Sequence, residues 1–240
     1  MKQDYFLTMD LDWCPEWILE KVLCNLGDIP LTIYMTNYSR WIESKILEGA
    51  KWTLGLHPNF ESGSSHGQDP GAVFEFLLNQ FPFAVSWRAH SLLNSNRVFE
   101  SFSRMKQLKV VTNRYDPFFK LSCVGKEEFF LKSYLDLPIH FEDDLALVDD
   151  PQFERSRNLL TLAEKKHELV TISFHPIHIY LNSINMEIYN RYKTRIYSGG
   201  KFTLDHRQGQ NYGVGQIFKE FLDSKPNLVS IDEVVAKYPL

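Results

Sequence analysis

The stretch TMDLDW (residues 8–13) decides how the fold is interpreted. It overlaps the end of YFLTM (5–9), an apolar segment rich in strand-forming residues, so it predicts the end of a buried strand. Asp10 and Asp12 lie two residues apart, and on a strand such residues point to the same side of the sheet. Two neighbouring carboxylates are costly unless something compensates their charge. The pair therefore indicates a functional site at this strand end.

Predicted helices and strands alternate after this stretch. Helical spacing of apolar residues covers PEWILEKVLCNLG (15–27) and SRWIESKILEGA (39–50), where Ser39 is the expected N-cap. The strand-and-helix unit continues to KVVTN (109–113) and repeats every ~25 to 40 residues, which is typical of βα units and a parallel sheet.

The second half of the chain is less regular. LVTISFH (169–175) predicts another buried strand, and GQIFKEFLDSKP (215–226) another helix. Residues 183–214 contain four glycines, and we expect an irregular excursion there. No linker or repeat divides the sequence, so we predict one α/β domain over residues 1–240.

Composition narrows the class of protein. The 240 residues carry a formal charge of −4, which argues against a nucleic-acid binder that depends on phosphate neutralisation. No apolar run approaches the length of a membrane span, about 18 residues, and the N-terminus lacks the features of a signal peptide. The three cysteines have no metal-finger spacing. We therefore expect a cytoplasmic protein, while its oligomeric state stays open.

Reactive side chains follow four predicted strands. Besides the aspartate pair, His57, Arg88 and His175 each stand at or just after a strand end. Ligands of parallel α/β folds bind where the carboxyl ends of the strands meet. A carboxylate and two imidazoles with an open position are typical of a catalytic divalent-metal site. Structural roles are the alternative, since an aspartate can cap a helix and Arg88 can form an ion pair. The occurrence of all these reactive residues at one edge of the sheet favours a functional site.

The order of these strand ends resembles the polysaccharide deacetylase (NodB-like) family of carbohydrate esterases. LGLHPNF (54–60), WRAHSL (87–92) and SFHPIHIYLN (173–182) look closest to the WbmS-like branch found in surface-polysaccharide (O-antigen type) gene loci. The resemblance covers roughly residues 5–235. It implies a distorted (β/α) barrel of about seven parallel strands, removal of an N-acetyl group from a sugar, and one bound divalent metal, usually zinc.

The resemblance also implies roles for individual residues. By position, Asp10 matches the catalytic base and His175 the catalytic acid, while Arg88 matches the arginine of the family. Asp12 and His57 match metal ligands.

One expected metal ligand is missing. The second metal histidine of the family lies four residues after the first, where this chain has Glu61. We prefer His90 as the replacement, because it lies two residues after Arg88 and would share its side on a regular strand. His66, in the loop GSSHGQDPG, and Glu61 itself are the alternatives.

Further residues are expected around this centre. We expect substrate contacts from Trp13, Asn59 and His178. His178 could instead hold Asn182. The acid that orients the arginine or the late histidine is expected in the run HFEDD, at Glu142, Asp143 or Asp144.

Three functions fit these residues. The first is a metal-dependent N-deacetylase acting on a sugar intermediate of surface-polysaccharide biosynthesis. The second is another amide C–N hydrolase of the same fold, which could work without metal. The third is a carbohydrate-binding protein that keeps the fold without the chemistry.

Overall fold

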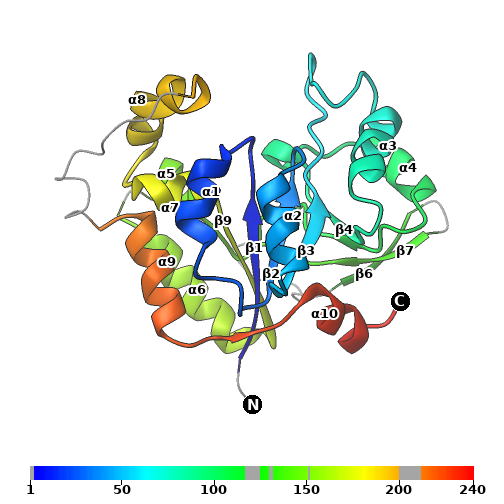
Figure 1. The fold of residues 1–240 in the computed structure, drawn as a ribbon. Helices are drawn as coiled ribbons and strands as arrows, with labels where there is room; N and C mark the ends of the chain where they lie inside the picture. Colours follow the sequence, from blue (N-terminus) through cyan, green and yellow to red (C-terminus); the bar gives the residue numbers. More distant parts are fainter. Residues whose placement is uncertain (1–2, 117–124, 130–131, 151, 200–211) are drawn as a thin grey trace.

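A computed structural model describes residues 3–116, 125–129, 132–150, 152–199 and 212–240. One sheet runs through the molecule, with helices packed around it (Figure 1). Its strands are β1 (Asp4–Asp10), β2 (Leu31–Met35), β3 (Trp52–Leu56), β4 (Ser86–Trp87), β5 (Val110–Val111), β6 (Gly125–Phe129), β7 (Lys132–Asp136), β8 (Phe141–Glu142), β9 (Leu169–Phe174) and β10 (Asn227–Leu228).

The strands follow the order β6-β7-β5-β4-β3-β2-β1-β9-β8, and β10 pairs with β1 outside this path. Among the described strands, only β6 and β7 pair antiparallel. The sheet curls without closing, so β6 and β8 end its described path. The predicted α/β class with a barrel-like parallel sheet is confirmed, as a curled half-barrel.

The helices alternate with the strands along most of the chain. They are α1 (Glu16–Leu23), α2 (Arg40–Leu47), α3 (Pro70–Gln80), α4 (Asn96–Arg104), α5 (Asp143–Asp149), α6 (Glu154–Lys166), α7 (Pro176–Leu181), α8 (Met186–Tyr197), α9 (Val214–Asp223) and α10 (Ile231–Lys237), with a 3₁₀ turn, η1, at His90–Leu92. None of the helices in the described ranges is long and apolar enough to cross a membrane.

Local sequence explains several helix boundaries. The hydroxyl of Ser39 accepts a hydrogen bond from the backbone N–H of Ile42, which confirms the predicted cap of α2. Asp69 caps α3 in the same way, and Pro70 occupies the first helical position, where no N–H is needed. α1 ends at Leu23, before the predicted stop at Gly27.

The expectation of irregular structure over residues 183–214 is wrong for its first half. The side chain of Asn185 caps α8, and Ile188, Tyr192 and Ile196 are buried at helical spacing. Counting glycines missed this helix because the glycines lie after its end. Residues 200–211 of the predicted excursion, and Cys123, lie outside the described residues.

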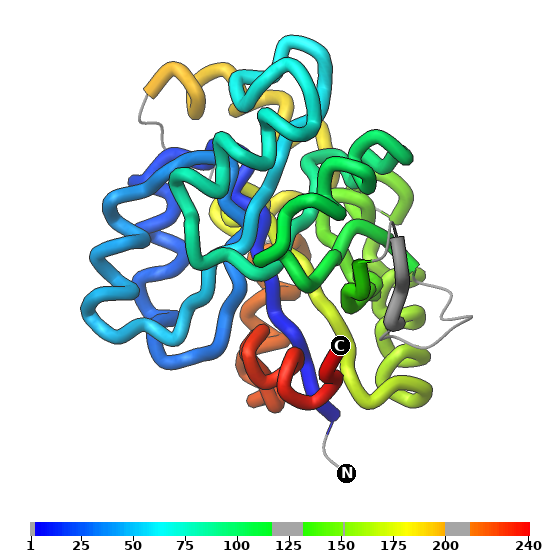
Figure 2. The backbone as a smooth tube through the Cα atoms, turned by 90° about the vertical axis from the view of Figure 1, so that its right-hand side faces the viewer, coloured from blue at the N-terminus to red at the C-terminus, as the bar shows by residue number. Residues whose placement is uncertain are grey.

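The central strands are buried on both faces. Every residue of β2 and β9 is buried, and so are the last five of β1, as expected where helices cover both sides of a parallel sheet. The N-terminal end of β1 and helix α10 lie at one end of the molecule, and α8 and the segment before α3 lie at the opposite end (Figures 1 and 2). The carboxyl ends of the strands therefore point toward the side of the molecule on which α8 and that segment lie.

Candidate active site

The four reactive strand ends meet at one edge of the sheet. β1 lies between β9 and β2, and β3 lies between β2 and β4, so the parallel register brings their carboxyl ends together. A cavity of about 270 Å³ opens there. Its polar walls are Asp10, Asp12, His57, His90, Ser91, Glu142, Asp144 and His175. We call it the inner cavity.

Asp12 contacts two imidazoles in the inner cavity. Its Oδ1 lies 3.0 Å from Nε2 of His57 and 2.9 Å from Nδ1 of His90. The ligand atoms of these three residues all lie within 4.8 Å of one another. Burial would raise the pKa of Asp12, but the two histidine contacts outweigh it and hold that pKa well below its usual value.

The ring orientation of His57 constrains what lies between these groups. Its Nδ1 is 2.8 Å from the backbone carbonyl of Arg88, and a carbonyl can only accept, so Nδ1 carries a proton. In the neutral ring Nε2 then presents a lone pair toward the Asp12 carboxylate, which is also an acceptor. Two acceptors at this distance need a cation between them, either a proton or a metal ion.

Left-handed backbone conformations occur at Asp12 and next to His90. Asp12 and Trp13 have φ of 46° and 56°, and Ser91 and Leu92, directly after His90, have φ of 57° and 49°. Such values are unfavourable for residues with a side chain, especially a bulky one. The structure holds the first turn by a hydrogen bond from the Trp13 N–H to the Thr36 hydroxyl. Strained backbone thus flanks two of the three side chains that face one another.

His90 contacts Asp12, but not from a regular strand shared with Arg88, as the spacing predicted. β4 ends at Trp87, and His90 begins the 3₁₀ turn η1. The alternatives lie elsewhere: Nδ1 of His66 accepts the backbone N–H of Asn59, and Glu61 accepts from Ser91. Neither His66 nor Glu61 joins a metal-ligand group within the described ranges.

Asp10 forms a buried ion pair with Arg88. The side chains are 2% and 0% exposed, and Nη1 of Arg88 lies 2.8 Å from Oδ1 of Asp10. The guanidinium also donates to Thr8, Thr112 and Ser173. Burial would lower the pKa of Arg88, but the Asp10 charge outweighs it and raises that pKa. Arg88 thereby compensates the charge of the first aspartate, so a single cation at Asp12 removes the penalty of the pair.

Asp143 fixes the orientation of His175 by contacting Nδ1, on the side of the ring away from Asp10 and Asp12. Nδ1 of His175 lies 2.6 Å from Oδ1 of Asp143, and its backbone N–H donates to Oδ2 at 2.9 Å. Its Nε2 lies 3.9 Å from Asp10, the last residue of β1, and 3.5 Å from Asp12, two residues after that strand. Burial would lower the pKa of His175, but the charges of Asp143 and Asp144 raise it well above its usual value.

The predicted acidic run divides into different environments. Asp143 orients His175, as described, whereas Glu142 and Asp144 line the inner cavity. Burial, reinforced by the Asp144 charge, raises the pKa of Glu142 well above its usual value, and burial raises the pKa of Asp144 too. Oε2 of Glu142 is buried without a hydrogen-bond partner among the described residues. These three acids are consecutive in the sequence, so their different environments follow from the fold alone.

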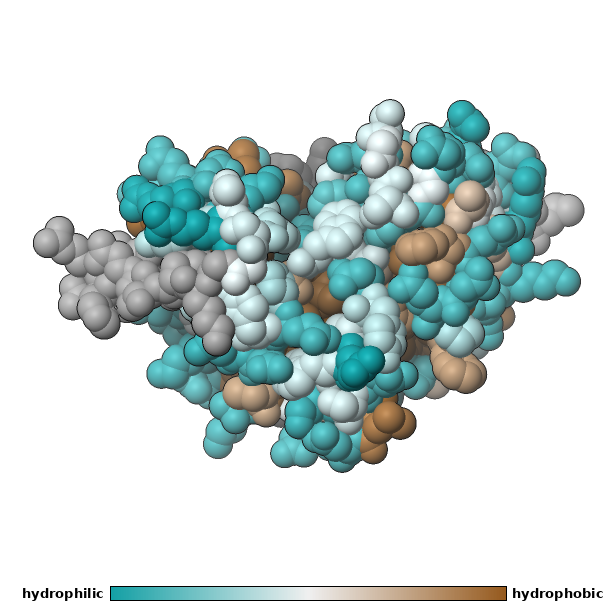
Figure 3. Space-filling model, turned by 45° about the horizontal axis from the view of Figure 1, so that its top comes forward, coloured by the Kyte–Doolittle hydropathy of each residue, from teal (hydrophilic) through white to brown (hydrophobic). Residues whose placement is uncertain are grey.

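A second cavity, of about 480 Å³, adjoins the first and shares four lining residues with it. We call it the outer cavity; its further walls are Trp13, Ile177, His178, Met186, Tyr189, Lys193 and Tyr197. Figure 3 turns this side of the molecule forward and shows a mainly hydrophilic face with scattered hydrophobic side chains. Burial lowers the pKa of His178 to about 4, so its ring is neutral near pH 7.

The expected substrate contacts divide between these places. Trp13 and His178 line the outer cavity. Nδ1 of His178 contacts the Ser183 hydroxyl at 3.2 Å, and the His178 backbone carbonyl accepts from Asn182. Asn59 lines neither cavity. Its side-chain oxygen accepts a hydrogen bond from the backbone N–H of Glu61 instead.

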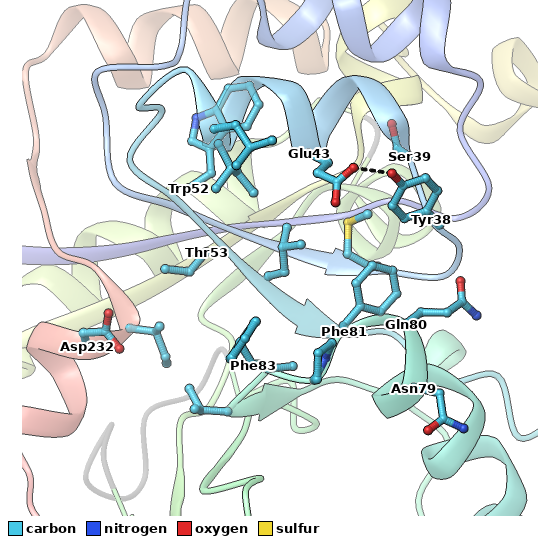
Figure 4. A pocket seen from close by; sticks show the side chains of 18 residues that line it. Tyr38, Ser39, Glu43, Trp52, Thr53, Asn79, Gln80, Phe81, Phe83 and Asp232 are labelled. Atoms are coloured by element: carbon cyan, nitrogen blue, oxygen red, sulfur yellow. Dashed lines mark hydrogen bonds between the residues drawn. The ribbon is translucent and has the colours of Figure 1, made fainter.

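A larger cavity, of about 700 Å³, lies away from the reactive residues. It is framed by α2, β3 and the segment between α3 and β4, where Trp52, Phe81 and Phe83 give it a mostly apolar wall (Figure 4). Its acids include Glu43, which accepts a hydrogen bond from Tyr38, and Asp232. It holds none of the clustered histidines, so size alone does not locate the chemistry.

Comparison with known proteins supplies the family context. A family model described as WbmS-like polysaccharide deacetylase matches residues 7–193. No curated protein matches the chain. The fold is similar to the crystal structure of WbmS from Bordetella bronchiseptica, described as a polysaccharide deacetylase involved in O-antigen biosynthesis. The TM-score is 0.70 and the identity 21%, over 92% of this chain and 90% of that one.

A second solved structure is more distant. It is an uncharacterised protein of Agrobacterium tumefaciens, with a TM-score of 0.47 and 10% identity over 83% of this chain and 85% of that one. A similarity of this size carries no argument. At 21% identity, the likeness to the Bordetella structure establishes the fold alone.

Proposed function

Since this chain belongs to the WbmS-like polysaccharide deacetylase family, we propose that it is a metal-dependent hydrolase that removes an N-acetyl group from a sugar. The reaction forms a C–O bond at the acyl carbon and breaks its C–N bond, giving acetate and a free amine. We place the substrate among the intermediates of surface-polysaccharide biosynthesis, in keeping with the branch that the sequence resembles.

One observation carries the proposal: a single oxygen of Asp12 faces nitrogens of His57 and His90. The hydrogen bond from His57 to the Arg88 carbonyl leaves the inward nitrogen free to act as a ligand. One carboxylate and two imidazoles beside a cavity form a donor set suited to zinc and similar divalent ions. These three residues would hold the ion.

A divalent ion in this position supplies Lewis-acid polarisation of the acyl carbonyl and activation of water. The remaining steps belong to the protein. Asp10 accepts the proton of the attacking water. Its Oδ1 is engaged by Arg88, which leaves Oδ2 for that proton. The buried ion pair keeps Asp10 in one orientation, since the guanidinium is itself held by three hydroxyl groups.

His175 donates the proton that the leaving nitrogen requires. Its raised pKa favours the protonated ring at neutral pH, and its Nε2 points into the inner cavity. Asp143 is a positioning residue, because it holds Nδ1 and the backbone N–H of the same histidine. Base and acid therefore approach the acyl group from two neighbouring strands, β1 and β9.

Metal content and acetate release test the proposal together. Wild-type protein should contain about one equivalent of divalent metal and release acetate from an N-acetylated sugar. Asp12→Asn and His57→Ala should lose both metal and activity, whereas Asp10→Asn should keep the metal and lose activity. His66→Asn and Glu61→Gln are the matched controls and should keep the metal. If the wild-type protein stays metal-free after zinc is supplied, the result contradicts the proposal.

A further inference from the structure

Among the described residues that line the outer cavity, Lys193 is the one lysine or arginine. It lies on α8 between Tyr189 and Tyr197, four residues from each, so the three side chains lie on one face of the helix. That face turns toward the outer cavity. The buried face of α8 is formed by Ile188, Tyr192 and Ile196 instead, so Lys193 does not serve to anchor the helix.

The ammonium group of Lys193 is available to a ligand. It lies 5.4 Å from the centre of the Tyr189 ring, and within the described ranges no carboxylate forms an ion pair with it.

Charge is distributed unevenly between the two cavities. Four carboxyl groups line the inner cavity, those of Asp10, Asp12, Glu142 and Asp144, and two of them, Asp12 and Asp144, also line the outer cavity. Lys193 lines the outer cavity but not the inner one, so its positive charge attracts an anionic group of a ligand to the outer cavity. The aromatic rings of Trp13 and Tyr197 beside it offer apolar faces on which a sugar ring can stack.

We propose that Lys193 binds a phosphate or carboxylate group of the same substrate whose acetamido group enters the inner cavity. The substrate class is then an acidic N-acetylated sugar, either a sugar linked to a diphosphate or a sugar acid. This inference rests on the proposed function for the position of the acetamido group.

The test separates binding from hydrolysis. Three probes are titrated into metal-loaded wild-type protein by calorimetry: N-acetylglucosamine, its uridine diphosphate derivative and its uronic acid. Lys193→Met, Lys193→Arg and the control Lys219→Met, which removes an equal charge outside both cavities, are titrated in parallel. Acetate release is then measured for every probe that binds.

Wild-type protein should bind at least one acidic probe about tenfold or more tightly than the neutral one, as expected for a charge-assisted contact. Lys193→Met should abolish this preference, Lys193→Arg should retain most of it, and Lys219→Met should match the wild type. The acidic probe whose affinity falls in Lys193→Met identifies the anion as diphosphate or carboxylate.

Each failure has a distinct meaning. Absence of Lys193-dependent binding for both acidic probes overturns the inference, even if acetate is released from the neutral sugar. Lys193-dependent binding without acetate release from any probe supports the anionic subsite and contradicts the proposed deacetylation.

Discussion

Asp143 accepts two hydrogen bonds from His175, one from the ring Nδ1 at 2.6 Å and one from the backbone N–H at 2.9 Å. The carboxylate is fully buried, and it begins α5 directly after β8. Backbone and ring of one histidine are therefore fixed by one side chain. This leaves Nε2 as the only ring nitrogen that faces the inner cavity.

Replacing Asp143 by Asn should reduce kcat by two orders of magnitude or more, as ~10²-fold is the lower range for a disabled acid catalyst. The carboxylate raises the pKa of His175, so its removal lowers that pKa. A general acid must be protonated, and activity is lost as the pH rises through its pKa. The alkaline limb of the kcat–pH profile should therefore move to lower pH, and an unmoved limb would contradict the role of Asp143.

Replacing Arg88 by Met should destabilise the protein by about 3–5 kcal/mol, because it leaves Asp10 buried without its partner. Urea unfolding measures this change. The double variant Arg88→Met with Asp10→Asn should recover part of the loss, since it removes the uncompensated charge as well. Equal stability of the single and double variants would show that the ion pair does not govern the effect.

Zinc should raise the melting temperature of the metal-free protein. A ligand present at 100 times its Kd stabilises by about 2.7 kcal/mol, which corresponds to roughly 5–10 °C for a chain of this size. Asp12→Asn should show no such shift, whereas His66→Asn should shift like the wild type. Thermal unfolding followed by circular dichroism at several zinc concentrations gives the result.

Acid should destabilise the fold through His140. Burial lowers the pKa of His140 to about 3, and its Nδ1 accepts the backbone N–H of Thr171, so the folded protein keeps the ring neutral. Between pH 6.5 and about 3 the unfolded chain binds the extra proton, so stability falls with falling pH, by up to ~1.4 kcal/mol per unit. His140→Asn keeps an acceptor for Thr171 and should flatten this slope in urea titrations between pH 6 and 4.

A methyl group at Gly55 should disturb the ion pair of Arg88 and Asp10 through the Tyr34 ring. It would lie 2.5 Å from ring carbons of Tyr34 and 2.8 Å from the Ser86 hydroxyl. The Tyr34 ring packs 4.6 Å from the Arg88 guanidinium, so its displacement would affect the ion pair with Asp10. Gly55→Ala should cost about 1–3 kcal/mol of stability and lower kcat as well. Gly27→Ala serves as control, because the added methyl group would meet only the Ala50 side chain, at 3.9 Å, and stability and kcat are measured for both variants.

The alternation of strand and helix signals was enough to predict the α/β fold with a parallel sheet. It also indicated which reactive residues stand at strand ends, because side-chain periodicity and breaker residues act over a few neighbouring positions. Since the carboxyl ends of parallel strands share one edge, the sequence alone predicts that Asp10, His57, Arg88 and His175 lie on the same side of the molecule. Their chemical roles stay predictions.

Tertiary structure decided what those local signals leave open. His90 approaches Asp12 at the start of a 3₁₀ turn shortly after a two-residue strand, and the left-handed residues Ser91 and Leu92 follow it. Packing rather than propensity imposes such a turn. Among three consecutive acids, only Asp143 contacts Nδ1 of His175. The two residues are 32 positions apart in the chain, so the sequence pattern does not indicate which acid makes this contact. Lys193 of α8 likewise lines the same outer cavity as Trp13, although the two residues are far apart in the chain. A pattern along the chain carries no information on such long-range contacts, whereas the close packing of the folded chain fixes them.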